Sequence, residues 1–400
     1  MKKIITLFVF LLSAGLITGQ QTVDYILKAR ALNESGKPDQ AIALLNGAIN
    51  ETKDSRLYTE RAEANILKGD YSGAIADYNE ANKITTGSGE YGLSRIYALK
   101  GDASTSLYHL ELNFNSTDKR SEKEILLDPS FGSIDNRPEW RQFWKKEWYT
   151  ITEKSISEIE YYLSAGKIDQ SKEVLSELKK SNESDTGITY AESLINLASG
   201  NYSEVLKSIP QLITSDQGNE KYLRILAKAQ TGVSDQAGAS STYTQLLANG
   251  AADAGLLLLR ADCYQKTGET DKALSDLKRY LDIYPQNIAA LSLAGKVEAK
   301  SGDNLKALEY YSQNLKLHPN DPACYIDRAN AYFISRSWDM AISDYSMSLD
   351  LKPGNSDAWL NKGIALLNSG KVDDACHDFR RSFSLGNKRV TDYISRNCIK

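Results

Sequence analysis

The sequence predicts an all-α fold made of repeated helix hairpins. The chain repeats its own pattern every 34 residues, and it has only 8 prolines in 400 residues. Its 23 tyrosines outnumber its 8 phenylalanines on a background rich in Ala, Leu, Lys and Glu. A fixed period of about 20 to 50 residues is the signature of stacked repeats. Few prolines and many helix formers favour helices as the repeated element.

The N-terminal residues 1–19 resemble a cleavable export signal. Lys2 and Lys3 precede an apolar run from Ile4 to Leu12, followed by small and polar residues. This order is typical of a signal peptide, and the run is shorter than the ~20 residues of a membrane span. We expect cleavage after Gly19 or Gln20; the alternative is a retained anchor. No Cys lies near the cleavage site, so a lipoprotein is disfavoured, and the short leader favours the periplasm.

The repeat becomes visible when Ala254 is taken as position 1. Small residues recur at positions 8 and 20, large ones at 4, 11 and 24, Gly at 15 and Pro at 32. Clear copies begin at 254, 288, 322 and 356, and degenerate copies at 152, 186 and 220. Three earlier copies begin near 22, 55 and 87. Position 20 is Ala or Ser in nine of these ten copies, with Val205 as the exception.

This pattern has a physical explanation in a helix, a tight turn and a second helix. Small side chains at positions 8 and 20 let the two helices approach closely, and large ones fill the space between neighbours. Gly at position 15 suits the turn, and Pro at position 32 ends the second helix. One hairpin cannot bury its own apolar face, so we expect the repeats to stack into a solenoid.

Repeat length, positions and residue types resemble the tetratricopeptide repeat (TPR) family. The resemblance implies a right-handed superhelix of about ten repeats, whose first helices line a concave groove that binds proteins or peptides. Arg336 and Ser234 depart from the family pattern, because each replaces Gly at position 15.

The repeat phase divides the chain into five expected segments. The phase breaks once, where DPSFGSIDNRPEW interrupts the helical pattern. The segments are a signal peptide (1–19), an N-terminal array of about three repeats (20–120), a Trp-rich connector (121–151), a C-terminal array of seven repeats (152–389) and a capping helix (390–400).

The connector carries three of the five tryptophans of the chain. Trp140, Trp144 and Trp148 are spaced four residues apart, which places them on one stripe if the segment is helical. A stripe of this kind usually packs into a core, here at the joint between the arrays. The alternative is an exposed docking stripe, because aromatic residues are enriched in binding hot spots.

Catalytic and cofactor motifs are weak or missing in the sequence. The stretch from Gly87 to Gly92 matches G-x-G-x-x-G but follows a helix rather than a strand, so a turn is the better interpretation. Three dispersed histidines leave little room for a metal site, and a net charge of −4 disfavours nucleic-acid binding. We therefore expect no enzyme, cofactor or metal.

The four cysteines fall into two groups. Cys263 and Cys324 lie where repeats need small buried residues, so we expect core thiols. Cys376 lies on the last second helix and Cys398 on the expected cap. A disulfide between these two would attach the cap; two buried thiols are the alternative, since spacing alone does not prove proximity.

The family resemblance implies that first-helix positions 2, 5, 9 and 12 face the groove. In the last four repeats we predict that this partner site includes Leu258, Asp262, Lys296, Ile326, Asn330, Phe333, Leu360, Ile364 and Leu367. The alternative is that the apolar members pack between helices. Some TPR domains grip the C-terminal carboxylate of a partner with Lys, Asn and Arg side chains on successive first helices. This sequence matches that set only in part, because Ile326 replaces the Lys.

Two functions remain open on the sequence alone. The first is an exported, non-enzymatic scaffold that binds a protein or peptide of unknown identity in the concave groove. The second is a structural subunit of a cell-envelope complex that acts by self-association. Neither requires nucleic acid or a membrane span after removal of the leader.

Overall fold

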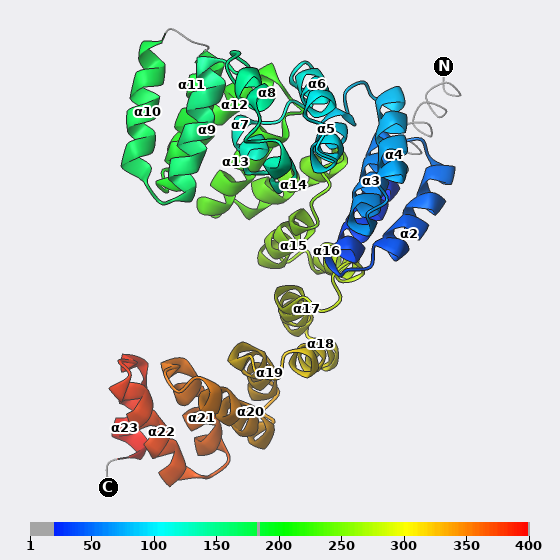
Figure 1. Cartoon of the computed structure of the whole chain (residues 1–400). Helices are drawn as coiled ribbons and strands as arrows, with labels where there is room; N and C mark the ends of the chain where they lie inside the picture. Colours follow the sequence, from blue (N-terminus) through cyan, green and yellow to red (C-terminus); the bar gives the residue numbers. More distant parts are fainter. Residues whose placement is uncertain (1–19, 182–184, 399–400) are drawn as a thin grey trace, which may run out of the picture. The chain divides into compact units, whose positions relative to one another are not determined.

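The computed structural model describes residues 20–181 and 185–398 (Figure 1). The expected signal peptide, residues 1–19, lies outside the described residues. The described part consists of α-helices and short 3-10 helices, with no β-strand. Consecutive helices pack against each other in pairs, for example α3 (Ser55–Lys68) with α4 (Tyr71–Ile84). The predicted all-α, helix-hairpin fold is confirmed.

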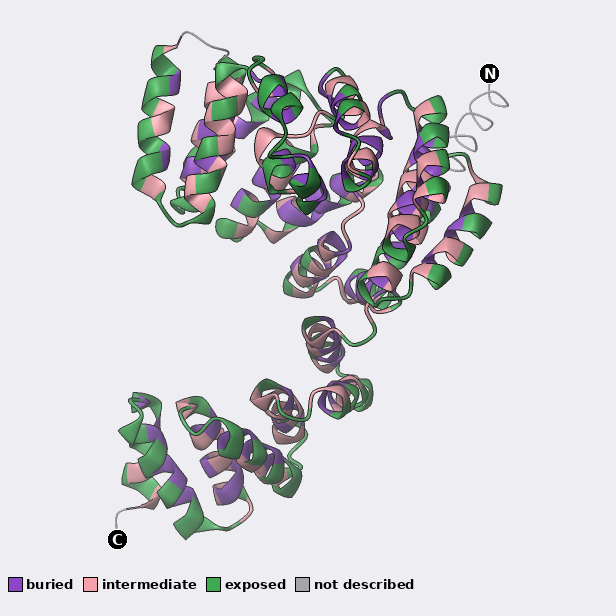
Figure 2. Cartoon of the chain, viewed as in Figure 1, coloured by how far each residue is buried: buried purple, intermediate pink, exposed green. Residues whose placement is uncertain are grey.

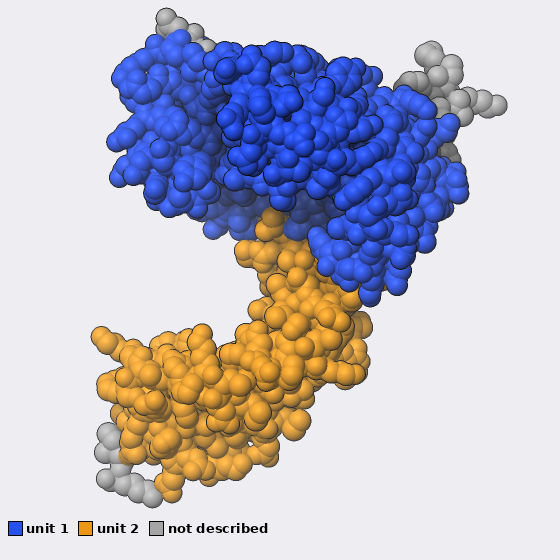
Figure 3. All heavy atoms as spheres, in the orientation of Figure 1, with its two compact units in different colours: residues 1–256 blue, residues 257–400 orange. Residues whose placement is uncertain are grey.

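The chain forms two compact units, residues 1–256 and residues 257–400 (Figure 3). The expected connector, 121–151, does not separate the units but lies inside the first. Its aromatic side chains share one core with α5 (Glu90–Leu99) and α6 (Ala103–Phe114). We refer to residues 1–256 as unit 1 and to residues 257–400 as unit 2.

Unit 1 begins with a helix over residues 20–34. The further helices of unit 1 are α2 (Pro38–Glu51), α3, α4, α5, α6, α7 (Glu122–Leu127), η1 (Pro129–Ser133), α8 (Pro138–Phe143), α9 (Ile151–Ser164), α10 (Ile168–Lys180), α11 (Asp185–Ala198), α12 (Tyr202–Ser215), α13 (Glu220–Gly232) and α14 (Gln236–Ala248).

Unit 2 follows in regular pairs of helices. Its elements are α15 (Gly255–Thr267, which begins at the end of unit 1), α16 (Thr270–Leu281), α17 (Ile288–Ser301), α18 (Asn304–Leu317), α19 (Pro322–Ile334), α20 (Trp338–Leu351), α21 (Ser356–Asn368), α22 (Val372–Ser384), η2 (Lys388–Val390) and α23 (Thr391–Asn397). Among the described residues, no helix is long and apolar enough to span a membrane.

The small residues of the repeat lie where two helices meet. Ala273, Ala307, Ala341 and Ala375, all at position 20, are fully buried. Buried positions gather on the helix sides that face a neighbouring helix (Figure 2). Gly363 at position 8 touches the next helix so closely that an added Cβ would lie 2.6 Å from the Phe379 ring. Small side chains therefore set the spacing of each hairpin.

The turn at position 15 requires a left-handed backbone. Gly302 and Gly370 have φ angles of 95° and 83° there. Ser234 and Arg336, which replace Gly in two repeats, have φ angles of 63° and 59°. The turn geometry therefore persists where glycine is missing. These two residues hold a left-handed backbone conformation, which is energetically unfavourable for an L-residue with a side chain.

A buried ion pair recurs inside four repeats and was not predicted. It joins position 7 of the first helix to position 23 of the second, sixteen residues later, in the pairs Arg61–Asp77, Arg260–Asp276, Arg328–Asp344 and Lys362–Asp378. Arg260 donates two hydrogen bonds of 2.7 Å to Asp276. Both side chains are largely shielded from water, so each carboxylate depends on its basic partner.

The tryptophans of the connector form a core and not a docking stripe. Trp140 is 6% exposed, and Trp144 and Trp148 pack against the same cluster. Helix α8 ends at Phe143, so Trp148 does not lie on it and instead donates its indole N–H to the Phe143 carbonyl at 2.8 Å. The exposed-stripe alternative is wrong, because burial of these rings joins the connector to α5 and α6.

The C-terminal end of unit 2 is covered by η2 and the short helix α23. Val390 is fully buried, and the Tyr393 ring stacks on Phe379 with centroids 5.1 Å apart. Cys376 and Cys398 form a disulfide with a Cα–Cα distance of 5.5 Å. Cys263 and Cys324 are buried free thiols, and burial raises the pKa of each to about 11.

Candidate functional site

Two neighbouring cavities lie in unit 1. The first has a volume of about 800 Å³ and is lined mainly by the helix 20–34, α3, α5 and the loop that follows α6. The second has a volume of about 1140 Å³ and is lined by the same loop, α7, α9, α11 and α13. Asp118 and Arg120 of the loop line both cavities, which therefore adjoin each other at this loop.

Several residues that line the first cavity lie at repeat positions that the family resemblance assigns to the groove. The lining residues at positions 2, 5 and 9 of the first three repeats are Ile26, Arg30, Arg56, Thr59, Glu63 and Tyr91. Our sequence prediction missed this site, because it applied these positions only to the last four repeats. The same positions, applied to the three N-terminal copies, would have identified these residues.

A network of charged side chains joins neighbouring repeats beside the first cavity, whose lining includes its members Glu63, Tyr78 and Tyr91. Arg95 of α5 contacts Glu63 of α3 at 2.7 Å and Asp128 at 3.0 Å. The Tyr91 hydroxyl donates to Asp128 at 2.8 Å, and the Tyr78 hydroxyl donates to Glu63. This network holds the inner faces of α3 and α5 in a fixed relation, since every member has a partner.

The same network shifts the pKa values of its members. Burial opposes the charge of Arg95, but Glu63 and Asp128 outweigh it and raise the pKa of the guanidinium. Burial and the hydrogen bond to Asp128 raise the pKa of Tyr91 above its ordinary range. Burial would also raise the pKa of Asp128, but hydrogen bonds from Ser130 and Tyr91 outweigh it and lower the value. The walls therefore keep fixed charges at neutral pH.

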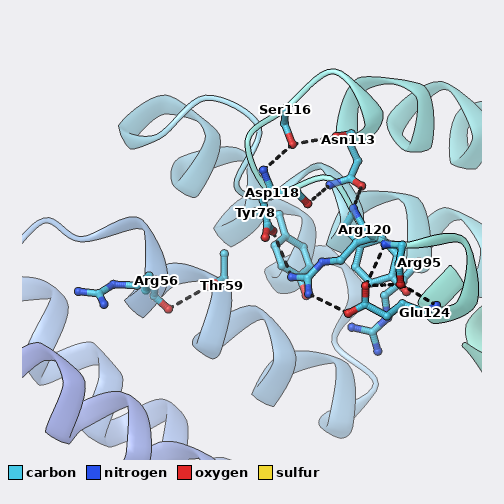
Figure 4. Close-up of polar contacts among 12 residues, drawn as sticks. Arg56, Thr59, Tyr78, Arg95, Asn113, Ser116, Asp118, Arg120 and Glu124 are labelled. Carbon is cyan, nitrogen blue, oxygen red and sulfur yellow. Dashed lines mark hydrogen bonds and ion pairs between the residues drawn. The ribbon is translucent and has the colours of Figure 1, made fainter. Parts of the chain in front are cut away.

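The loop of residues 115–121 contributes side chains to both cavities, and polar contacts brace it (Figure 4). Asn113, fully buried at its base, donates to the Asp118 carbonyl at 2.9 Å and accepts from the Arg120 amide at 3.1 Å. The Tyr149 hydroxyl donates to the Arg120 carbonyl at 2.7 Å. The Arg120 side chain reaches Asp118 at 3.1 Å and Glu124 at 3.6 Å. These contacts fix the loop of residues 115–121 to the connector, so that both form a rigid edge of the cavities.

The walls of the two cavities offer groups suited to binding. They combine hydroxyls, paired charges and tyrosine rings, which can position the polar groups of a ligand. Within residues 20–181 and 185–398, no group of three His, Cys, Asp or Glu side chains is placed to hold a metal ion.

The groove predicted in unit 2 is only partly accessible. Leu360 is 2% exposed and belongs to a core cluster, so its assignment to the groove is wrong. Ile364 and Leu367 are partly buried against the same cluster. Phe333 packs against Tyr345 and its neighbours, and Asn330 accepts a hydrogen bond of 2.6 Å from the Tyr345 hydroxyl. Packing between helices occupies these positions.

Other predicted groove residues do meet across neighbouring first helices. Lys296 of α17 lies 3.5 Å from Asp327 of α19, and Ser292 also donates to Asp327. Asp262 pairs with Lys266 on its own helix. Leu258 and Ile326 are half-buried. Each polar member of the predicted set therefore has its partner outside the set, and the apolar members mainly pack between helices.

Family models for the tetratricopeptide repeat match residues 26–88 and 256–287. The structure is similar to a tetratricopeptide repeat protein from Parabacteroides merdae, at 19% identity and a TM-score of 0.49, over 61% of this chain and 97% of that chain. It is also similar to the APC/C hetero-tetramer Cut9–Hcn1, at 12% identity and a TM-score of 0.45, over 96% and 99% of the two chains.

A third similar structure is YrrB, described as a TPR protein with an unusual peptide-binding site, at 16% identity and a TM-score of 0.37, over 47% of this chain and 98% of that chain. No curated protein has a matching sequence. We take no functional argument from the structural similarities. The two family matches show tetratricopeptide repeats at residues 26–88 and 256–287, and the pairs of helices continue beyond these ranges.

Proposed function

We propose that this chain is a non-enzymatic scaffold that binds a segment of a partner protein on the inner face of unit 1. Tetratricopeptide repeats are scaffolds for protein–protein interaction, which gives the general class. The observation that supports the specific site is the pair of adjoining cavities, of about 800 and 1140 Å³, lined by groove positions of successive repeats. Typical small-molecule pockets hold roughly 300 to 1,000 Å³, and two adjoining cavities of this size suit a segment of a protein chain.

The chemistry of the second cavity favours a polar segment. Lys123 and Lys221 line it together with Tyr149 and Tyr222, and acidic side chains such as Glu160 line it as well. Lys119 lies over the Tyr149 ring, 4.6 Å from its centroid. Tyrosine rings and charges of both signs in this combination can hold a peptide through its backbone and its polar groups.

A pull-down from envelope extract tests the site. We expect Lys123→Glu with Lys221→Glu to lose the partner, because the reversal removes two of the four basic side chains of the lining and makes the cavity strongly acidic. The matched control is Lys207→Glu, an exposed lysine on the second helix α12 that lines neither cavity. Retention of the partner by the double variant, or equal loss in the control, would contradict the site.

We also propose export to the periplasm, supported by the leader pattern in residues 1–19. Intact-mass measurement of the protein from the periplasmic fraction should give a chain that begins at Gln20 or Gln21, and a mass that includes Met1 would refute cleavage. The pull-down also addresses the structural-subunit alternative: a stoichiometric assembly of copies of this chain would favour self-association.

A further inference from the structure

One segment of unit 1 contacts the inner face of the first two repeats. Residues 249–254 connect α14 to α15. Arg30 of the first helix donates from Nη1 to the Ala252 carbonyl at 2.8 Å, and Arg56 of α3 donates from Nη1 to the Gly250 carbonyl at 3.0 Å. These contacts join residues that are 222 and 194 positions apart in the sequence.

Carboxylates hold both arginines in place for these contacts. Arg30 donates from Nε to Glu60 at 2.8 Å, and Glu60 is largely buried. Asp54 accepts two hydrogen bonds from the Arg56 side chain, at 3.0 and 2.7 Å. Each guanidinium is thus fixed by an acid and still has an N–H directed at a main-chain carbonyl. Donors fixed in this way bind a carbonyl without losing further side-chain freedom.

The segment fits this surface because its side chains are small. Gly250 has a φ of 86°, and a Cβ added there would lie 3.0 Å from Arg56 Nη1. Ala252 packs against the core cluster of the first two repeats, and it also lines the first cavity. Ala251 and Ala254 are buried. A larger side chain at 250 or 252 would push the segment off the surface.

Arg30 and Arg56 occupy positions 9 and 2 of their repeats, which are groove positions. Their contacts with Gly250 and Ala252 are made to the main chain, so they do not depend on the identity of a side chain. Gly250 follows the end of α14 in a left-handed turn, in which the Ala251 amide donates to the Leu246 carbonyl. A segment of another protein with small side chains and a similar turn presents the same carbonyls.

We propose that residues 249–253 are an internal ligand of the first two repeats, which a partner segment rich in Gly and Ala must displace. This inference rests on the proposed function, since it concerns the same inner face. A tethered ligand competes at an effective concentration set by its connection. If the displaced state is populated at about one in ten or less, the apparent affinity for a partner falls by at least tenfold.

The experiment uses a synthetic peptide of residues 247–255 as the probe and the full mature chain as the receptor. Gly250→Leu with Ala252→Lys weakens the internal ligand and leaves Arg30 and Arg56 intact. We expect this release variant to bind the peptide at least tenfold more tightly than the unmodified chain, measured by calorimetry. Adding Arg30→Ala and Arg56→Ala to the release variant should abolish binding.

The matched control is Gly218→Leu, a glycine in the loop before α13 with no atom within 4 Å of an added Cβ. It should bind the peptide as weakly as the unmodified chain. Should the release variant fail to fold, hydrogen exchange of the unmodified chain decides: saturating peptide should accelerate exchange in residues 249–254.

A release variant that loses unfolding free energy without gaining affinity would overturn the inference, because the segment would then be only a structural brace. Unchanged exchange in residues 249–254 at saturating peptide would overturn it as well. Neither result affects the pull-down of the partner through Lys123 and Lys221, so failure of the inference can be distinguished from failure of the proposed function.

Discussion

Arginine has different partners in the repeats of unit 2 and on the inner face of unit 1. In unit 2, Arg260 pairs with Asp276, sixteen residues later in the same hairpin. In unit 1, Arg30 pairs with Glu60 and Arg95 with Glu63, 30 and 32 residues away in a neighbouring repeat. Pairs within a repeat hold one hairpin together, whereas pairs between repeats shape a surface. Each unit also holds an example of the other kind, Arg61–Asp77 in unit 1 and Lys296–Asp327 in unit 2. We propose that pairs within a repeat serve stability, and that the pairs on the inner face of unit 1 also serve binding.

The largest expected effect comes from breaking a pair within a repeat. Arg260→Ala leaves the Asp276 carboxylate, 7% exposed, without its main partner. We expect a loss of about 3 kcal/mol in the free energy of unfolding, since an uncompensated buried charge is costly. Urea unfolding measures it. Lys272→Ala, which removes an exposed pair with Glu269 in the same repeat, should cause no measurable change; equal effects would contradict the distinction.

The disulfide gives unit 2 a constraint at its C-terminal end. Cys376 and Cys398 are 22 residues apart, so by the chain-entropy estimate the bond contributes about 3 kcal/mol. Cys398→Ser should expose α23 to rapid hydrogen exchange, and a reductant should have no further effect on that variant. Thiol counting on the unfolded, unreduced chain should find two free thiols; four would show that the bond is absent.

Close contact between helices should make one glycine of unit 2 hard to replace. Gly363→Ala places a methyl group against the Phe379 ring, and we expect a loss of about 2 kcal/mol in unfolding free energy, because the pair must separate. Gly47→Ala is the matched control, a helical glycine of unit 1 with no atom near an added Cβ. It should be neutral or stabilising by about 0.5 kcal/mol.

Acid should affect Asp128 of unit 1 and Asp378 of unit 2 in opposite directions. The pKa of Asp128 is lowered, so its contribution to stability is present above the unfolded pKa and is lost as the pH falls through the folded value. Burial raises the pKa of Asp378 more than Lys362 lowers it, so stability is lost as the pH rises through the folded value.

Asp128→Asn and Asp378→Asn should each flatten one of these two dependences between pH 3 and 6, measured by urea unfolding. The same slope for both variants would show that the two carboxylates do not differ in environment.

The smallest effect concerns the turns without glycine, one in each unit. Ser234 and Arg336 hold positive φ angles, and replacing either by Gly relieves strain of about 1 kcal/mol, partly offset by the greater freedom of glycine in the unfolded chain. We expect a gain of about 0.5 kcal/mol in each case. A melting temperature that falls in either variant would mean that the side chain makes contacts worth more than the strain.

The sequence by itself determined the repeated hairpin, because its signals are local. Ala at position 20, Gly at position 15 and large residues at position 24 act within one hairpin, and the turn persists at Ser234 and Arg336. The pairs such as Arg260–Asp276 could also have been found, since they recur at one spacing. The groove positions of the first repeats were present in the same register.

Only the tertiary structure decided which residues of the repeats are buried and which contacts their surfaces make. Burial of Leu360 and of Trp140 depends on which helix packs next to each, and periodicity within one element does not contain that information. The contact of Arg30 with the Ala252 carbonyl joins residues 222 positions apart through a main-chain atom. Every residue has such a carbonyl, so no pattern of side chains marks it, and only the path of the folded chain selects it.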